Sequence, residues 1–235
     1  IAQIECANNV LLKQKSEPQG LIKISCPSVM MHFQIRTLLN QFLKDYPKVQ
    51  IELELTSRRV DLIHDDIDLA IRTNFQANED SSLIVRDVIK TTHCLVASPE
   101  LLKGRHIQHF TELHEFPSVV LGMQKSQYYW HLNNREHGEV IDIPLQPRIK
   151  SNDLAGVYYA VCDGFGIADL PYLAIEQDIK QGKLIHVLPE WCSNLGTVQL
   201  VYASRKGQRL VMEKLIDYLV EGLRDLAKDH SGYAL

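Results

Sequence analysis

The sequence predicts an α/β fold made of two similar lobes. Short apolar runs that suit buried strands alternate with longer segments whose apolar residues recur at helical spacing. This alternation is typical of helices that pack against mostly parallel sheets. The pattern occurs in two successive blocks along 235 residues, a length that allows one large or two small domains. We therefore expect two lobes, joined by chain crossings near Val88–Thr92 and near Ser193–Val198.

The first block has the signals of three strands and two helices. In chain order we expect a strand at Leu21–Ile24, a helix at Val29–Tyr46, a strand at Ile51–Leu55, a short helix around Val60–His64 and a strand at Ile67–Ile71. Helical spacing predicts an apolar inner face of the long helix, formed by Met31, Ile35, Leu38, Leu39 and Phe42. The second strand alternates apolar residues with glutamates, which indicates that one of its faces is exposed.

The second block begins near Thr92 with a strand at His93–Ala97, followed by a helix that Ser98 and Pro99 cap. Further strands are expected at Val119–Leu121, Tyr128–Leu132 and Ile143–Ile149. A strand at Thr197–Ala203 and an amphipathic helix at Leu210–Leu226 then return the chain to the first lobe.

Residues 151–191 predict a compact helix–turn–strand–helix–strand unit. Asn152 or Asp153 caps its first helix, and Gly164 and Gly166 end that helix, because glycine tolerates the left-handed conformation of a C-terminal turn. The remaining signals are a buried strand at Ile167–Leu170, a helix that starts at Pro171 and ends at Gly182, and a strand at Leu184–Val187.

The composition is that of an ordinary globular protein and excludes several classes. The formal net charge is −4, so the chain lacks a basic nucleic-acid footprint. No apolar run is long enough to span a bilayer, and we expect no membrane association. The chain opens without an initiator Met or a secretory signal, which suggests a fragment. Its five cysteines form no CxxC pair, so we expect no disulfide framework, no metal site and a reducing, cytoplasmic location.

Five segments together carry a resemblance to a known family. They are Gly20–Ile24, Phe42–Val49, Asp68–Arg72, Val96–Leu102 and the long run Ser151–Trp191. In their order and spacing they resemble the C-terminal effector-binding domain of LysR-type transcriptional regulators. The resemblance covers the chain from about Gly20 to about Leu226, and it departs at Leu101, where the family often has Tyr.

The resemblance implies a fold of two Rossmann-like lobes joined by two crossover strands, as in type II periplasmic binding proteins. It implies that residues 1–19 are the end of a linker helix and a linker, that 20–90 plus 197–228 form a discontinuous lobe I, and that 91–196 form lobe II. The family's winged helix-turn-helix domain is then absent from this chain. In such a fold a ligand binds between the lobes, outside the carboxyl ends of the strands.

The implied function is an effector-binding and dimerisation domain, in which a small molecule bound between the lobes modulates transcription. The expected partners are a small anion or organic acid, a second copy in a homodimer or homotetramer, and DNA only through the missing domain. We expect no enzyme activity and no cofactor. A periplasmic-type solute-binding protein with the same fold is the alternative, and a small-molecule enzyme is a third class for which we find no nucleophile and base set.

Predicted helix starts supply donors for an anionic effector. Ser28 follows the first strand, and Ser151 and Asn152 precede a helix of the second lobe, so free backbone N–H groups would face the ligand. Asp153 opposes an anion there unless it points away as a cap. Plain helix caps and turn chemistry are the alternatives for these polar residues, and core packing is the alternative for Ile167. The expected effector-binding residues are Ser28, Val29, Met30, Thr73, Asn74, Leu121, Gly122, Ser151, Asn152 and Ile167.

The resemblance also implies a dimer in which a first-lobe helix pairs with a second-lobe helix of the other subunit. The expected contact residues are Met30, Phe33, Val157 and Tyr158, with internal packing as the alternative. Cys26 is a candidate redox residue, because a helix terminus near Ser28 would lower its pKa. A buried thiol that behaves as a small apolar side chain is the alternative there.

Overall fold

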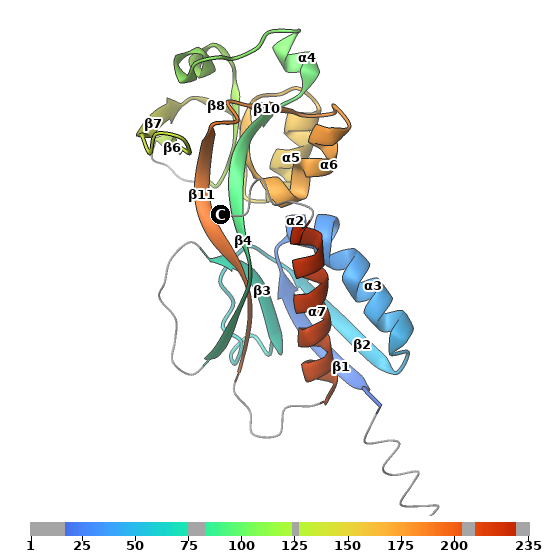
Figure 1. Cartoon of the computed structure of the whole chain (residues 1–235). Helices are drawn as coiled ribbons and strands as arrows, with labels where there is room; N and C mark the ends of the chain where they lie inside the picture. The colour runs from blue at the N-terminus through green and yellow to red at the C-terminus, as the bar shows by residue number, and fades with distance from the viewer. Residues whose placement is uncertain (1–16, 75–82, 124–126, 204–209, 229–235) are drawn as a thin grey trace, which may run out of the picture. The chain divides into compact units, whose positions relative to one another are not determined.

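The computed structural model describes residues 17–74, 83–123, 127–203 and 210–228 (Figure 1). Most of the segment predicted to be a linker helix and linker, residues 1–19, lies outside the described residues. The described residues fall into two compact units. The first unit holds residues 17–73, 83–89, 198–203 and 210–228, and the second holds residue 74, 90–123 and 127–197. The assignment of the chain to regulatory lobes I and II, with the boundaries given above, stays a prediction.

Two long strands carry the chain from one unit to the other. They are β4 (Leu83–Ala97) and β11 (Trp191–Ala203). The predicted strands at His93–Ala97 and Thr197–Ala203 are therefore only the last parts of these elements. Charged and polar residues such as Arg86, Asp87 and Lys90 interrupt the apolar pattern in the first part of β4, which is why the sequence does not reveal it.

The first unit is built on a sheet whose central strand is β1 (Gly20–Cys26). This strand pairs in parallel with β2 (Val49–Leu55) on one side and with β3 (Leu69–Asn74) on the other. Beyond β3 the sheet continues to β11 and β4. The order β2-β1-β3 brings the carboxyl ends of three parallel strands to one edge of the sheet.

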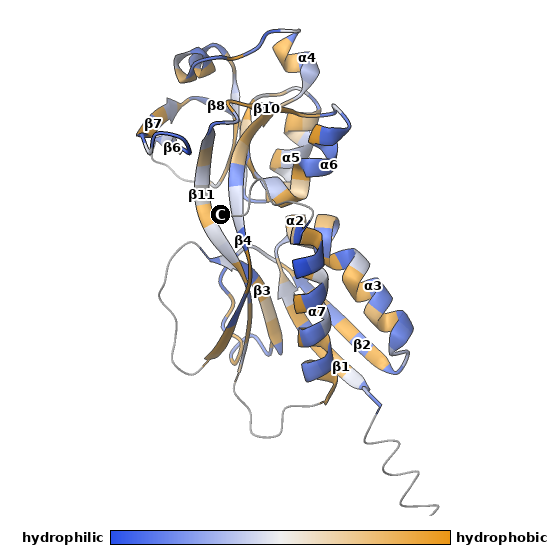
Figure 2. Cartoon of the chain, in the orientation of Figure 1, coloured by the Kyte–Doolittle hydropathy of each residue, from blue (hydrophilic) through white to orange (hydrophobic). Residues whose placement is uncertain are grey.

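Two helical segments pack together beside this sheet (Figure 1). The first runs from Ser28 to Asp45 as α2 (Ser28–Met30), a π-helical turn η1 (Met31–Ile35) and α3 (Arg36–Asp45). The second is α7 (Leu210–Lys228), whose alternating apolar and polar faces are visible in Figure 2. Of the predicted inner face of the first helix, Ile35, Leu39 and Phe42 are buried, whereas Met31 and Leu38 are half-buried.

Two elements of the first unit differ from the prediction. The segment around Val60–His64 forms a turn, not a helix, because the carboxylate of Asp61 accepts the backbone N–H groups of Ile63 and His64 and holds the chain locally. The third strand begins at Leu69, after the turn, and extends to Asn74. Ile67 is buried but lies before the strand.

The second unit contains a larger set of short elements. They are α4 (Pro99–Leu102), the 3₁₀ helix η2 (Phe110–Glu115), β5 (Ser118–Leu121), β6 (Tyr128–Asn134), β7 (Val140–Leu145), β8 (Pro147–Ser151), α5 (Leu154–Cys162), β9 (Ala168–Pro171), α6 (Tyr172–Lys180) and β10 (Ile185–Val187). Antiparallel β6 and β7 form a hairpin, β6 also pairs with β11, and β9 and β10 pair with β4. Both parallel and antiparallel pairs are therefore present in the chain.

The predicted strand Ile143–Ile149 is two strands that belong to different pairings. Residues up to Leu145 pair antiparallel with β6, whereas residues from Pro147 pair in parallel with β5. A continuous apolar pattern in the sequence spans both strands, and it does not show which neighbour each half joins.

The helix boundaries of the second unit follow the predicted signals closely. The Ser98 side chain accepts the backbone N–H of Leu101 and caps α4, and Asp153 accepts that of Ala155 and caps α5. Gly164 ends α5 with a φ of +77°, where a side chain would be strained. Gly166 has a different role, because a Cβ atom there would lie 2.7 Å from the carbonyl oxygen of Pro117.

Candidate functional site

In the first unit, the predicted effector residues gather at the carboxyl edge of the sheet. Ser28 is the first residue of α2, two residues after β1 ends, and Thr73 and Asn74 end β3. The Thr73 hydroxyl donates to the Met30 sulfur at 3.9 Å, so these two residues meet. The side chains of Val29 and Met30 are buried, whereas Ser28, Thr73 and Asn74 are half-buried.

The start of this first helix has a feature that suits an anion. Pro27 occupies the N-cap position with extended backbone angles, and its side chain makes no capping hydrogen bond to the first turn. Since the chain stays helical from Ser28 to Asp45, its first N–H groups and its dipole point to the edge where β1 and β3 end. Such a terminus can accept a carboxylate.

In the second unit, a matching edge forms where β5 and β8 end. Leu121 and Ser151 are partners at the end of this parallel pair. Gly122 follows with a φ of +113°, and its backbone N–H donates to the Ser151 carbonyl at 2.6 Å. The Gly122 carbonyl accepts the Tyr128 hydroxyl at 3.0 Å. These bonds continue the β5–β8 pairing by one residue and tie Gly122 to the start of β6, and its role toward an effector stays a prediction.

The start of α5 is capped, in contrast to that of α2. The Ser151 hydroxyl accepts the Asp153 N–H at 3.0 Å and donates to the Asp153 carbonyl at 2.9 Å. The Asp153 carboxylate accepts the Ala155 N–H at 3.3 Å. A carboxylate therefore already uses one donor that an anionic ligand would need, whereas the neighbouring Asn152 side chain is exposed.

Two predicted apolar residues of the second unit lie in different surroundings. The Leu121 side chain is 45% exposed at the end of β5. Ile167 is fully buried in the apolar core, and its backbone bonds to the carbonyl of Pro117 and the N–H of Val119. The structure therefore gives Ile167 the core position that the sequence left as an alternative, and its role toward an effector stays a prediction.

The predicted lowering of the Cys26 pKa is wrong. The Cys26 thiol is fully buried at the end of β1, and burial raises its pKa to about 12. Its sulfur donates to the Pro27 carbonyl at 3.4 Å. The neutral thiol is therefore favoured, as expected for a small buried side chain and not for a reactive thiolate.

Three of the four predicted dimer residues have buried side chains within the single chain. They are Met30, Val157 and Tyr158, whereas Phe33 is half-buried. The Tyr158 hydroxyl donates to Asp178 at 2.8 Å and accepts from Lys183 at 2.8 Å. Burial favours the internal-packing alternative for these three side chains, and the assignment of the interface stays a prediction.

A buried polar cluster in the second unit was not identified as a group by the sequence. Asp169 accepts the Ser193 hydroxyl at 2.5 Å and lies 3.2 Å from Nδ1 of His93. The Thr92 hydroxyl donates to the Ser193 carbonyl at 3.1 Å. These residues lie far apart in the sequence, so only strand pairing could have placed them together. Because the serine bonds to the carboxylate and not to the imidazole, the cluster lacks the geometry in which a histidine activates a nucleophile.

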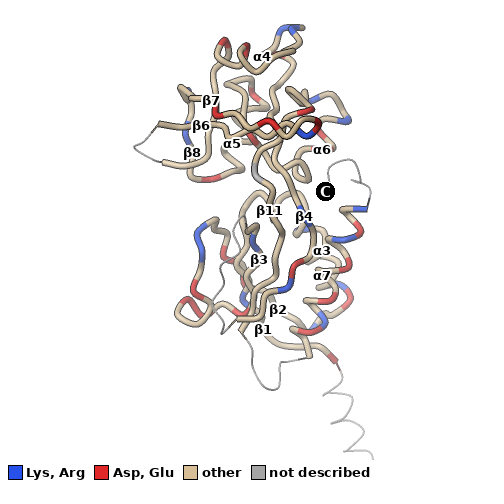
Figure 3. The backbone as a smooth tube through the Cα atoms, turned by 60° about the vertical axis from the view of Figure 1, so that its left-hand side comes forward, with Lys and Arg blue, Asp and Glu red and all other residues tan. Residues whose placement is uncertain are grey.

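Charge, membrane and metal features of the described residues add little to these sites. Basic and acidic residues are interspersed along α3 and α7 (Figure 3). Within the described ranges, no helix combines the length and apolar character needed to cross a membrane. The same residues include no group of three or more His, Cys, Asp or Glu side chains arranged to hold a metal ion.

Comparison with known proteins places this geometry in a family. The sequence profile of the LysR substrate binding domain matches residues 15–224. The chain is similar to the HTH-type transcriptional regulator PtxR of Pseudomonas aeruginosa, with 26% identity over 210 residues that cover 89% of this chain and 66% of PtxR. The chain thus spans just under two thirds of that relative.

Two solved structures show the same similarity in three dimensions. The regulatory domain of AphB from Vibrio vulnificus has a TM-score of 0.71 and 29% identity, covering 86% of this chain and 98% of that chain. The regulatory domain of CrgA from Neisseria meningitidis has a TM-score of 0.76 and 26% identity, covering 87% and 98%. These matches confirm the predicted α/β class and the predicted resemblance. The chain belongs to the LysR substrate-binding domain family.

Proposed function

We propose that this chain is the effector-binding and dimerisation domain of a LysR-type, DNA-binding transcriptional regulator that acts in the cytoplasm, and that it is not an enzyme. The family match supports the domain assignment, and the relatives in the comparison are named as regulators or regulatory domains. In this proposal the DNA is contacted through a separate N-terminal winged helix-turn-helix domain.

The proposed effector is a small organic acid, for which each unit by itself offers candidate contacts. The observation that carries this proposal is that the helix starts at Ser28 beside the carboxyl ends of β1 and β3, with a proline at the N-cap position that supplies no side-chain cap. Backbone N–H groups there suit one carboxylate. In the second unit, the capped start of α5 suits a neutral donor or acceptor on the ligand better than a second anionic group, and the exposed Asn152 amide supplies both.

Effector binding regulates only if the ligand distinguishes two states of the protein. A ligand shifts an equilibrium by no more than its difference in affinity for the two states. We propose that the effector favours one arrangement of the domain in the oligomer and so changes how the attached DNA-binding domains are presented. A homodimer or homotetramer is the expected assembly.

A thermal-shift screen of small organic acids and aromatic metabolites tests this proposal. A ligand that binds the native state raises the unfolding temperature in proportion to ln(1 + [L]/Kd). We expect a carboxylate hit whose amide analogue gives little shift. Ser28→Ala keeps the backbone N–H groups but removes the hydroxyl beside them, and it should weaken the affinity by about tenfold, the effect of one hydrogen bond to a charged group. Asn152→Ala should weaken the affinity by about three- to tenfold, the effect of one hydrogen bond to a neutral group.

Gln41→Ala is the matched control, because Gln41 is exposed on α3 and its amide bonds only to Asp45, one turn away, in the described contacts. This variant should keep the full shift. A hit that stabilises both Ser28→Ala and Asn152→Ala as strongly as the unmodified chain would contradict the assigned residues.

A further inference from the structure

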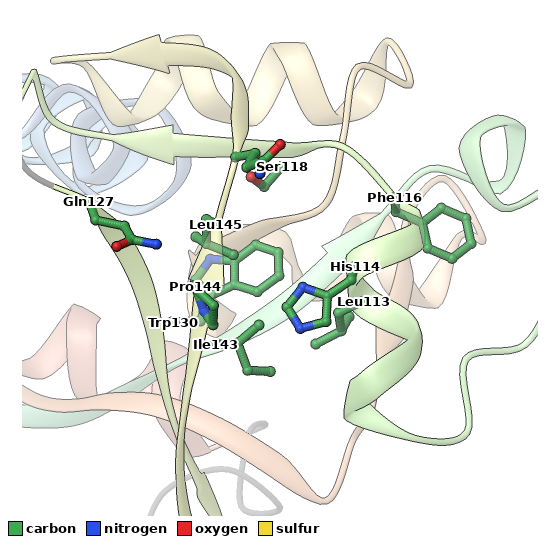
Figure 4. A pocket seen from close by; sticks show the side chains of 10 residues that line it. Leu113, His114, Phe116, Ser118, Gln127, Trp130, Ile143, Pro144 and Leu145 are labelled. Carbon is green, nitrogen blue, oxygen red and sulfur yellow. The ribbon is translucent and has the colours of Figure 1, made fainter.

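The second unit contains a pocket that none of the predicted effector residues lines. Its volume is about 280 Å³, and it lies between η2, the start of β5 and the β6–β7 hairpin. In Figure 4, Trp130 and Ile143 from the hairpin lie opposite Leu113 from η2. These three side chains are buried in the apolar core of the unit, so the pocket reaches from the surface to the core.

One polar atom of this pocket lacks a partner. Ser118 is the first residue of β5, its side chain lines the pocket, and only 3% of the residue is exposed. Its Oγ is buried without a hydrogen-bond partner among the described residues. Because a buried hydroxyl is destabilising when it is unpaired, native proteins almost always give such a group a partner. The unpaired Ser118 hydroxyl therefore indicates that a molecule enters the pocket and supplies the missing hydrogen-bond partner.

The chemistry of the lining defines the class of this molecule. Among the described residues that line the pocket, none is Asp, Glu, Lys or Arg, so a charged ligand would lose its hydration without gaining an ion pair to a carboxylate, ammonium or guanidinium group. Besides Ser118, the polar lining residues are His114, Gln127 and Gln146, which can form hydrogen bonds to a neutral ligand. Apolar side chains such as Leu113, Phe116 and Ile143 share the walls with these polar groups, and the indole of Trp130 suits a ring. The volume lies just below the usual range for ligand sites, which indicates a single small ring.

We propose that this pocket binds a small, neutral, ring-containing molecule with one hydroxyl group, and that Ser118 forms the hydrogen bond to that hydroxyl. The site is separate from the proposed effector residues, because Ser118 begins β5 whereas Leu121 and Gly122 lie at its other end. The proposal is therefore independent of the proposed function.

An NMR titration with phenol and toluene tests the site, because these two probes have nearly the same shape and differ in the hydroxyl. The readout is the indole N–H signal of Trp130, assigned with the variant Trp191→Phe, since the chain has two tryptophans. Both probes should shift this signal. We expect Ser118→Ala to lower the ratio of the toluene Kd to the phenol Kd by about three- to tenfold, the effect of one neutral hydrogen bond.

Two controls make the result decisive. Ser25→Ala makes the same change at an equally buried serine of the first unit and should leave the ratio unchanged. Ser118→Thr keeps a hydroxyl and should retain the preference for phenol. Ser118→Ala itself should fold normally, because it removes an unpaired buried group. An unchanged ratio in Ser118→Ala, or the absence of any shift of the Trp130 signal with either probe, would overturn the proposal.

Discussion

His186 on β10 illustrates how burial sets the charge state of a single side chain. Removal from water lowers the pKa of its imidazole from 6.5 to about 4, and the positive charge of Arg135 adds to this effect. Tyr158 shows the opposite direction for an acid: burial raises its pKa above the usual range, while its hydroxyl joins Asp178 and Lys183. Neither environment is visible in the sequence, because each depends on residues from other elements.

The lowered pKa of His186 predicts a loss of stability in mild acid. Between pH 6.5 and pH 4 the unfolded chain binds a proton at this histidine and the folded chain does not, so the free energy of unfolding falls as the pH falls. The shift corresponds to about 3 kcal/mol at most. Urea unfolding of the unmodified chain and of His186→Gln across this range measures it.

The variant should show a flatter decline of stability with pH than the unmodified chain. The two chains should have parallel profiles above pH 7, where the imidazole is neutral in both states. Parallel profiles down to pH 4 would show that His186 titrates normally in the folded protein.

At the level of elements, glycine is needed where the backbone of another segment lies too close to leave room for a side chain. The Gly164-Phe165-Gly166 turn follows α5, and the sequence predicts that both glycines end the helix. Only Gly164 has the left-handed conformation. Gly166 lies against the backbone at Pro117 and Ser118, next to the bridge that joins Ser118 to Ile167. In the sequence, a glycine that a turn requires cannot be distinguished from a glycine that close packing requires.

This distinction predicts different costs for two glycine substitutions. Gly166→Ala should lower the free energy of unfolding by about 2 kcal/mol, because the new Cβ meets rigid backbone at 2.7 Å. Gly222→Ala in α7 brings a Cβ within 2.4 Å of the end of the Leu38 side chain, which can rotate, and the helix gains about 1 kcal/mol of intrinsic propensity. Chemical denaturation of both variants measures their free energies of unfolding, and an equal decrease in the two would contradict the prediction.

At the scale of the whole molecule, the proposed assembly depends on which apolar side chains remain accessible. Of the predicted contact residues, Phe33 alone has a partly exposed side chain, since Met30, Val157 and Tyr158 are buried. A contact through these helices would therefore centre on Phe33 and on the backbone around it. The exposed apolar residue Val140, 64% exposed on β7, belongs to neither helix.

We predict that the chain forms a homodimer or homotetramer at micromolar concentration and that Phe33→Glu weakens this association at least tenfold. The reason is that a carboxylate would have to lose its hydration in an apolar contact. Sedimentation velocity over a concentration series measures the change. Val140→Glu is the matched control and should associate like the unmodified chain. A monomeric unmodified chain, or unchanged association of Phe33→Glu, would contradict the prediction.

Local signals in the sequence were enough to predict the α/β class, most helix positions and the family. These depend on local signals: helical spacing in α5 and α7, caps at Ser98 and Asp153, and a glycine at 164 that the helix end requires. The family segments also placed Ser28, Thr73 and Ser151 near strand ends, where the structure has them.

Strand pairing and the burial of individual side chains, in contrast, could be read only from the folded chain. It separated β7 from β8, extended β4 and β11, buried Cys26 and Tyr158, and left the Ser118 hydroxyl in a pocket. This is because apolar spacing indicates which side of a segment avoids water, whereas strand partners and burial depend on residues distant in the chain.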